Sequence, residues 1–133
     1  MPRELVRVAL EELDADAREA LLASPVSATL AFNGLDGYPR MVPCWFLWAD
    51  GAFHTTSLAG KYHVRALASD PRASFCVEVA EAFPDGSRRN RQAKGVGDVE
   101  LLEDPGGAWI TRIREKYLGR VELGSRAAAM GGE

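Results

Sequence analysis

The stretch that decides the fold runs from residue 26 to residue 79 and reads VSATLAFNG-LDGYPR-MVPCWFLWADG-AFHTTS-LAGK-YHVRALASDPR-ASFCVEV. Residues 26–33 and 40–49 are rich in Val, Phe, Trp and Thr, which favour strands. The tight loops at 35–38 and 50–51 each contain Asp-Gly and predict antiparallel hairpins. The next elements expected are a third strand containing FHTTS, a short helix over 61–69 and a strand over Ala73–Ala80.

The second strand carries the run MVPCWFLW at 41–48, which is apolar at odd and even positions. A strand with this pattern is expected to be covered on both faces. Pro43 has no N–H to give to a ladder, so it indicates a sheet edge, a bulge or the departure of one neighbouring strand.

The flanking segments predict helices, one more strand and a loop. Apolar spacing favours helix over 3–23, with Asp16 and Glu19 resembling a capping box for a second short helix through Leu22. The further expectations are a polar loop over 81–91, a strand over Gln92–Leu102 with a bulge or close approach at Gly95 and Gly97, a helix over Pro105–Leu118, and a loosely ordered tail over 119–133.

The composition describes one globular domain over residues 1–133, with 47% hydrophobic and 26% charged residues. A net charge of −3 argues against general binding to nucleic acid or membrane surfaces. No apolar run reaches the roughly 20 residues of a membrane span, and the charged N-terminus does not resemble a secretory signal. Cys44 and Cys76 lie in apolar runs and are expected to be buried free thiols, which fits a reducing cytoplasm.

The predicted architecture is mainly β with peripheral helices. Five or six antiparallel strands favour a small barrel, because closure removes exposed sheet edges. A flat sheet would leave the apolar strand at 41–48 half exposed, so self-association is also expected.

Hydroxyl and cationic side chains gather where the third strand gives way to the short helix. Hydroxyls and backbone N–H groups can donate to phosphate oxygens, a cation neutralises their charge, and the helix N-terminus adds a favourable field. The alternative is a capped turn with solvated charges. The residues of this candidate phosphate loop are Thr55, Thr56, Ser57, Lys61, His63 and Arg65.

A second polar group follows residue 87 and comprises Arg88, Arg89, Arg91, Gln92 and Lys94. Arginines in a Gly-Ser loop are more often simply solvated, and the aromatic interleaving of a nucleic-acid site is missing. No metal-ligand spacing, nucleotide-binding fingerprint or catalytic pair is evident, so the catalytic residues are unassigned.

The residues resemble the pyridoxamine-phosphate-oxidase-like family of split β-barrels, which bind FMN or a deazaflavin coenzyme. Four segments carry the resemblance in the family's order: ATLAFNGLDGYPRMVPCWF, FHTTS, VRALASDPRASFCVEV, and AKGVGDVELLEDP with a helix ending in KYLG. The resemblance covers about Leu21 to Leu118 and implies a six-stranded antiparallel split barrel. There are departures: His63 and Ala66 stand where the family usually has lysine and asparagine, and Lys61 lies two residues earlier.

The resemblance also implies a homodimer with the coenzyme at the subunit interface. The phosphate would face the loop at 55–65, and the late strand would bring Gln92 or Lys94 to the partner's site. The residues implied to lie along the isoalloxazine ring are Met41, Val42, Pro43, Cys44 and Trp45. Plain core packing is the alternative for several of them.

The expected function is hydride transfer through bound FMN, with an unknown small-molecule substrate. A deazaflavin-dependent reductase is the close alternative, with Arg88, Arg89 and Arg91 as candidates for binding its longer anionic tail. The competing classes are a non-catalytic flavin-binding or carrier module and a dimeric structural protein.

Overall fold

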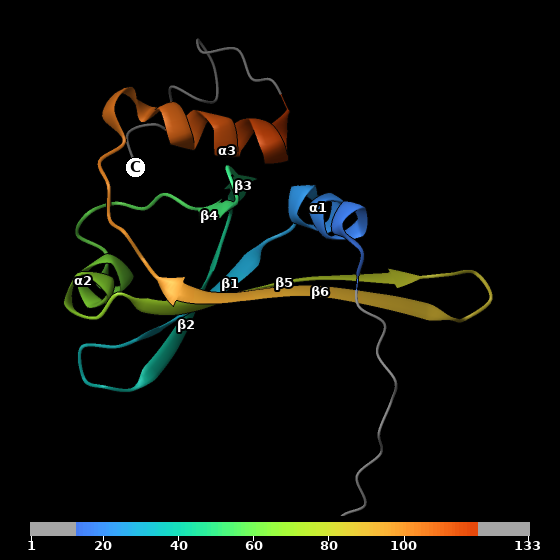
Figure 1. Ribbon diagram of the computed structural model, residues 1–133, viewed down its shortest axis with the longest axis horizontal. Helices are drawn as coiled ribbons and strands as arrows, with labels where there is room; N and C mark the ends of the chain where they lie inside the picture. The colour runs from blue at the N-terminus through green and yellow to red at the C-terminus, as the bar shows by residue number, and fades with distance from the viewer. Residues whose placement is uncertain (1–12, 120–133) are drawn as a thin grey trace, which may run out of the picture.

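The computed structural model describes residues 13–119, which form one four-stranded sheet, one two-stranded sheet and three α-helices (Figure 1). In chain order the elements are α1 (Ala15–Ala23), β1 (Ala28–Asn33), β2 (Pro39–Cys44), β3 (Leu47–Ala49), β4 (Ala52–His54), α2 (Tyr62–Ser69), β5 (Arg72–Ala82), β6 (Arg88–Asp98), the 3₁₀ turn η1 (Pro105–Gly107) and α3 (Ala108–Leu118). Residues 3–12 of the helix expected over 3–23, and residues 120–133 of the tail expected over 119–133, lie outside the described residues.

All strand pairings are antiparallel, as predicted. The larger sheet has the order β2-β1-β5-β6, and β3 pairs with β4 in the smaller one. Six strands are therefore present in residues 13–119, but these pairings do not close them into a barrel.

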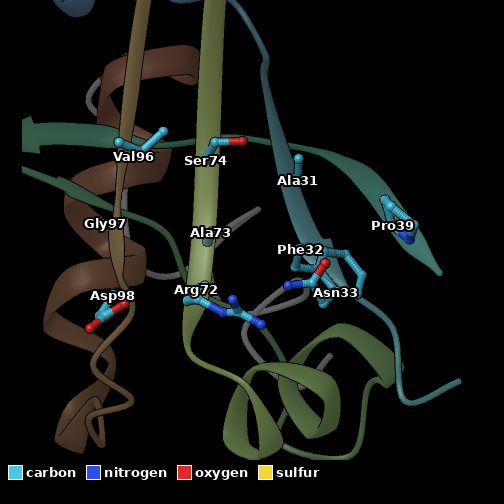
Figure 2. Close-up of a pocket in the computed structure, with 10 residues that line it drawn as sticks. All are labelled: Ala31, Phe32, Asn33, Pro39, Arg72, Ala73, Ser74, Val96, Gly97 and Asp98. Atoms are coloured by element: carbon cyan, nitrogen blue, oxygen red, sulfur yellow. The ribbon is translucent and has the colours of Figure 1, made fainter. Parts of the chain in front are cut away.

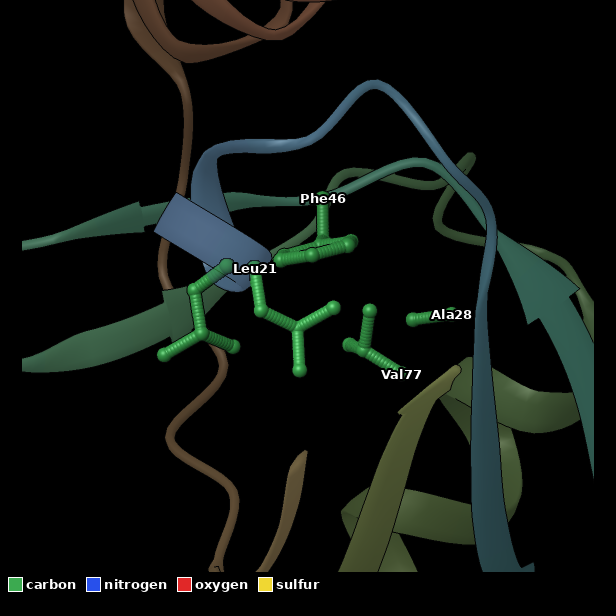
Figure 3. Packing of buried hydrophobic residues seen from close by; sticks show 5 residues of the cluster. Leu21, Ala28, Phe46 and Val77 are labelled. Carbon is green, nitrogen blue, oxygen red and sulfur yellow. The ribbon is translucent and has the colours of Figure 1, made fainter. Parts of the chain in front are cut away.

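One face of the four-stranded sheet carries the core. Leu21 and Leu22 of α1 pack with Ala28, Val77 and Phe46, and this cluster is drawn in Figure 3. A second cluster joins α2 to the same face of β1 through Ala66, Leu67, Leu30 and Phe32. The opposite face, called here the open face, has no helix packed on it among the described residues; its exposed members include Thr29, Met41, Pro43, Lys94 and Val96.

The predicted strand over 40–49 is two strands. β2 ends at Cys44, Trp45 and Phe46 leave the ladder, and β3 begins the smaller sheet at Leu47. The expectation that this run is covered on both faces is wrong, because Met41 points to the open face and is 74% exposed. The edge expected from Pro43 is confirmed, since β2 lies at the edge of its sheet.

The helix starts also differ from the sequence prediction. α1 begins at Ala15 because the Asp14 carboxylate accepts a hydrogen bond from the Ala17 amide at 2.7 Å, so Asp16 lies inside the first turn. α3 begins at Ala108, because Gly106 and Gly107 have positive φ and interrupt the helix after Pro105.

The predicted polar loop over 81–91 is mostly strand. β5 continues to Ala82 and β6 begins at Arg88, so only a short turn around Asp85 and Gly86 joins them. The Phe83 amide donates to the Ser87 carbonyl at 2.9 Å and closes this turn. The resulting long hairpin extends past the other strands, with its tip far from α2 (Figure 1).

β6 ends at Asp98 instead of Leu102. The β5–β6 register is continuous, so the glycines mark no bulge. The close approach expected at Gly95 is confirmed, since a Cβ there would overlap the Phe75 ring, whereas the space beside Gly97 is open. Cys44 and Cys76 are free thiols, as expected, but both are only partly buried. Within residues 13–119, none of the helices is long and apolar enough to cross a lipid bilayer.

Candidate functional site

An open hollow of about 510 Å³ lies between strand β2 and the N-terminus of α2. It combines the middle of the edge strand with the first turn of the helix, two segments that the sequence analysis assigned separately to ring and phosphate binding. Its lining residues are Phe32, Arg40, Met41, Val42, Tyr62 and His63.

Cationic side chains surround this hollow. The Arg40 guanidinium lies 4.9 Å from the centre of the Tyr62 ring, and Arg65 lies 5.6 Å from the same ring. Lys61 caps the start of α2 with its backbone, and its side chain is exposed. Of these cations, Arg40 has an ion pair, to Asp36 at 2.7 Å. The arrangement favours an anion beside the first turn of α2.

Tyr62 connects the hollow to the β1–β2 hairpin. Its hydroxyl accepts a hydrogen bond from the Leu35 amide at 2.9 Å. Asp36 also accepts from the Tyr38 amide at 3.1 Å, so the hairpin tip and Arg40 are held in one network. The hydrogen bond from Tyr38, and then that from Arg40, lower the pKa of the Asp36 carboxyl. Arg40 is thereby placed against the tyrosine ring.

His63 packs its ring 6.2 Å from the Phe32 ring. Partial burial, and then the charge of Lys61, lower its pKa below 6.5. The lowered pKa favours the neutral form of the histidine in the absence of an anion. The ring can donate or accept a hydrogen bond at the hollow, and an anion bound there would favour its protonated form.

The five residues implied to line a coenzyme ring do not lie on one surface. Met41 and Pro43 face the open side of the sheet, whereas Val42 and Cys44 face the core side. Burial raises the pKa of the Cys44 thiol. Because β2 is the edge strand among the described residues, the backbone N–H and C=O groups on its outer side have no ladder partner within 13–119 and can bind a polar ligand edge.

Trp45 lies beyond the end of β2 and belongs to a different neighbourhood. Its ring stacks on Tyr117 of α3, with centroids 4.5 Å apart and an interplanar angle of 7°. Its carbonyl accepts a hydrogen bond from the Thr55 hydroxyl at 2.7 Å. The Thr55 hydroxyl is therefore used in a contact with the backbone of Trp45. Of the two hydroxyl residues that follow, Thr56 is partly buried and Ser57 is exposed.

Gln92 and Lys94 are exposed on the open face of β6. In the strand order β2-β1-β5-β6, they are three strands away from β2, which corresponds to roughly 14 Å at the usual strand spacing. The structure therefore does not bring them to the hollow of their own protomer. Arg91 is paired with Glu81, and Arg88 and Arg89 lie in β6 beside the hairpin turn instead of in a loop.

Two lining residues, Arg40 and Tyr62, were missed as site candidates. The signal for Arg40 was its place at the end of the Asp-Gly-x-Pro-Arg turn, which brings it to the start of the edge strand. Tyr62 is the first residue of α2, and only the tertiary contact with the hairpin shows its role.

A second hollow of about 440 Å³ lies across β1, β5 and β6 (Figure 2). Arg72 dominates its polar lining and is paired with Asp70 at 2.8 Å, and Asn33 donates to the same carboxylate at 3.1 Å. The hydrogen bonds from Arg72 strongly lower the pKa of Asp70. The first hollow is the better anion site, because Arg40 and His63 line it and Lys61 and Arg65 lie beside it, whereas Arg72 is the one cationic side chain among the residues that line the second. Over the described residues, no group of three or more His, Cys, Asp and Glu side chains could hold a metal ion.

No protein-family profile matches the chain, and no curated protein matches it. Solved structures do. A conserved hypothetical protein from Mycobacterium tuberculosis superposes with a TM-score of 0.72 at 24% identity, over 90% of this chain and 72% of that one. An F420 reductase superposes with a TM-score of 0.64 at 26% identity, over 78% of this chain and 79% of that one.

A third similar structure is an FAD- and heme-binding protein from Mycobacterium smegmatis, with a TM-score of 0.64 at 22% identity, over 88% of this chain and 58% of that one. At these identities the superpositions establish the fold of the chain. They confirm the resemblance inferred from the sequence: the chain shares its fold with the pyridoxamine-phosphate-oxidase-like superfamily of flavin- and deazaflavin-binding split barrels.

Proposed function

We propose that this protein binds a flavin-type coenzyme at the hollow between β2 and α2 and acts as an oxidoreductase. The observation that carries the proposal is the juxtaposition of an apolar edge strand, at Met41 and Val42, with cations at the first turn of α2. The bound coenzyme would supply the hydride-transfer chemistry. The similarity to an F420 reductase and to an FAD- and heme-binding protein supports the same class.

The residues present fit the phosphate end of such a coenzyme. Arg40 and Lys61 would neutralise its charge, and His63 would contribute a hydrogen bond or a third charge. Thr56 and Ser57 offer hydroxyls on the preceding loop. Unpaired backbone groups on the outer side of β2 would bind the polar edge of the ring, with Met41 beside it.

FMN is the first choice among flavin-type coenzymes. A single terminal phosphate matches a single cationic hollow. The longer anionic tail of a deazaflavin needs further cations, and Arg91, one of the three arginines considered for it, is already neutralised by Glu81. The deazaflavin coenzyme F420 is the second candidate, favoured by the reductase that superposes over 78% of this chain.

A homodimeric split barrel is part of the proposal. The open face carries exposed apolar side chains at both edges, since Met41 is 74% and Val96 is 87% exposed. A second copy packed on this face would cover them and would bring its Gln92 and Lys94 toward the hollow of the first. The six strands would then form the barrel within such an assembly.

The test is a fluorescence titration with FMN, FAD and F420 separately, for the native protein, Arg40→Ala, Lys61→Ala and the control Arg18→Ala. Arg18 is an exposed cation on α1, away from the hollow. We expect micromolar binding of FMN, weakened about tenfold or more by the first two variants, because a charge-assisted phosphate contact contributes roughly 1.4 kcal/mol or more. The control should bind normally.

The absence of binding by all three coenzymes would overturn the proposal. Equal binding by all variants would move the site elsewhere on the molecule. A carrier module is the alternative function, and steady turnover of the bound coenzyme with an electron donor and acceptor would exclude it.

A further inference from the structure

Two side chains in the last turn of α3 bind the backbone of Phe46, where the chain passes from the four-stranded sheet to the two-stranded sheet. Phe46 is fully buried between β2 and β3, outside both ladders. The Tyr117 hydroxyl accepts a hydrogen bond from the Phe46 amide at 3.1 Å, and the Lys116 ammonium donates to the Phe46 carbonyl at 2.9 Å. Both backbone groups of this buried residue therefore find their partners on α3.

The same two side chains bind the end of α1 and the segment that follows it. Tyr117 donates its hydroxyl hydrogen to the Val26 carbonyl at 2.8 Å. Lys116 also donates to the Leu22 carbonyl at 3.2 Å. The end of α1, the entrance to β1 and the β2–β3 junction are thus joined at one place, called here the α3 clamp (Lys116 and Tyr117).

The α3 clamp is linked to the candidate site through Trp45. This residue directly follows β2, and its ring stacks on Tyr117 at 4.5 Å. Its carbonyl holds the Thr55 hydroxyl, at the start of the loop that leads to Lys61 and α2. A change at the clamp therefore reaches both the end of the edge strand and the beginning of the cationic loop.

Lys116 holds its position as a cation without a carboxylate. Within residues 13–119, no Asp or Glu lies within ion-pair distance of it. Its ammonium lies 3.5 Å from the centre of the Phe46 ring and 4.9 Å from that of Tyr117, and it sits in the last turn of α3, where a cation is favoured.

Partial burial lowers the pKa of Lys116 to about 8. The titratable groups facing it are the Tyr117 hydroxyl and, beyond Tyr117, the Cys44 thiol; burial raises the pKa of each. In this cluster the first proton lost on mild alkalinisation therefore comes from Lys116. Neutral Lys116 keeps fewer N–H donors for the Phe46 and Leu22 carbonyls and loses its attraction to the two rings.

We propose that Lys116 and Tyr117 are positioning residues for the coenzyme site, setting the β2 end and the 55–61 loop through Phe46, Trp45 and Thr55 without touching the coenzyme. The proposal rests on the proposed function for its effect on binding. It requires in addition that the clamp and the loop change together in the ligand-free protein.

The binding experiment measures the FMN dissociation constant from pH 7 to pH 9.5 for the native protein, Lys116→Met, Lys116→Arg, Tyr117→Phe and the control Glu115→Gln. Glu115 is an exposed neighbour on the same turn of α3. Lys116→Met and Tyr117→Phe should weaken binding at pH 7 about tenfold in protein that remains folded. Native affinity should fall with a midpoint near pH 8, and Lys116→Arg should keep its affinity to higher pH.

A ligand-free measurement separates failure of this proposal from failure of the proposed function. The amide NMR shifts of residues 55–57 should follow a titration with a midpoint near pH 8 in the native protein, and this titration should be absent in Lys116→Met and Lys116→Arg. If FMN does not bind but the amides titrate as described, the coenzyme assignment falls and the coupling stands. The positioning role would be overturned by either of two results. One is that the amide shifts of residues 55–57 titrate alike in the native protein and the Lys116 variants; the other is that folded Lys116→Met and Tyr117→Phe bind FMN with native affinity.

Discussion

Gly95 of β6 lies directly against the ring of Phe75, its register partner on β5, so that a Cβ at Gly95 would come within 2.8 Å of Phe75 Cζ and closer still to Cε1. Phe75 also stacks on Phe53 of β4, with centroids 4.5 Å apart. The glycine therefore leaves room for the aromatic contact that joins the two sheets.

Gly95→Ala should destabilise the protein by about 1–3 kcal/mol, because the added methyl group overpacks a contact that Phe75 cannot leave without losing Phe53. Gly97→Ala is the matched control, since nothing lies within 4 Å of a Cβ at that position. Chemical denaturation of both variants measures the difference. Equal unfolding free energies would show that the Phe75 ring moves aside at little cost.

Phe46→Ala should cost about 3–5 kcal/mol, as expected for a large aromatic side chain removed from a packed core. Phe46 is fully buried, stacks on Phe53 at 5.1 Å and receives the Lys116 ammonium on its ring. Phe83→Ala serves as the comparison, because Phe83 is 41% exposed beside the β5–β6 turn, and it should change stability by only ~0.5 kcal/mol. A small effect at both positions would contradict the assignment of Phe46 to the core.

Asp14→Ala should destabilise the protein by about 1 kcal/mol through loss of the N-cap of α1. Asp16→Ala should have a smaller effect, since the Asp16 side chain is exposed in the first turn and does not cap the helix. Urea unfolding of the two variants compares them directly. The reverse order would restore the capping box that the sequence suggested at Asp16 and Glu19.

The pH dependence of stability should contain a contribution from His63. Its folded-state pKa is lowered by burial and by Lys61, so at pH values around and below 6.5 the unfolded chain binds more protons than the folded one. The contribution of His63 to the free energy of unfolding is therefore fully present above pH 6.5 and decreases as the pH falls.

Urea unfolding of the native protein and His63→Gln at pH 7 and pH 5.5 measures this contribution. The variant should lose less stability on acidification than the native protein. Parallel losses would show that His63 titrates alike in the folded and unfolded states.

Much of the strand and helix order could be predicted from the sequence, because it rests on local signals. Asp-Gly turns set both early hairpins, and Ser69-Asp70-Pro71 ended α2 where the structure ends it. The choice of Asp16 over Asp14 as a cap failed because both residues suit an N-cap, and only the observed hydrogen bond to Ala17 distinguishes them.

The candidate site was predicted in part. Met41, Val42 and His63 were named from residue type and resemblance, and they do line one hollow. Arg40 and Tyr62 were not named, since the contact between their side chains depends on how the β1–β2 hairpin packs against α2. Thr55 was assigned to phosphate, whereas its hydroxyl is held by the Trp45 carbonyl.

The sequence by itself determined the antiparallel strands, the tight turns and the family resemblance, because these depend on the conformational preferences and spacing of neighbouring residues. Only the tertiary structure decided that the apolar run at 41–48 divides between two sheets at Phe46. That division depends on two hydrogen bonds of the Phe46 backbone, whose carbonyl accepts from Lys116 and whose amide donates to Tyr117, 70 and 71 residues further along the chain. An apolar pattern indicates that a residue avoids water, but it cannot tell which distant side chains form hydrogen bonds with its backbone.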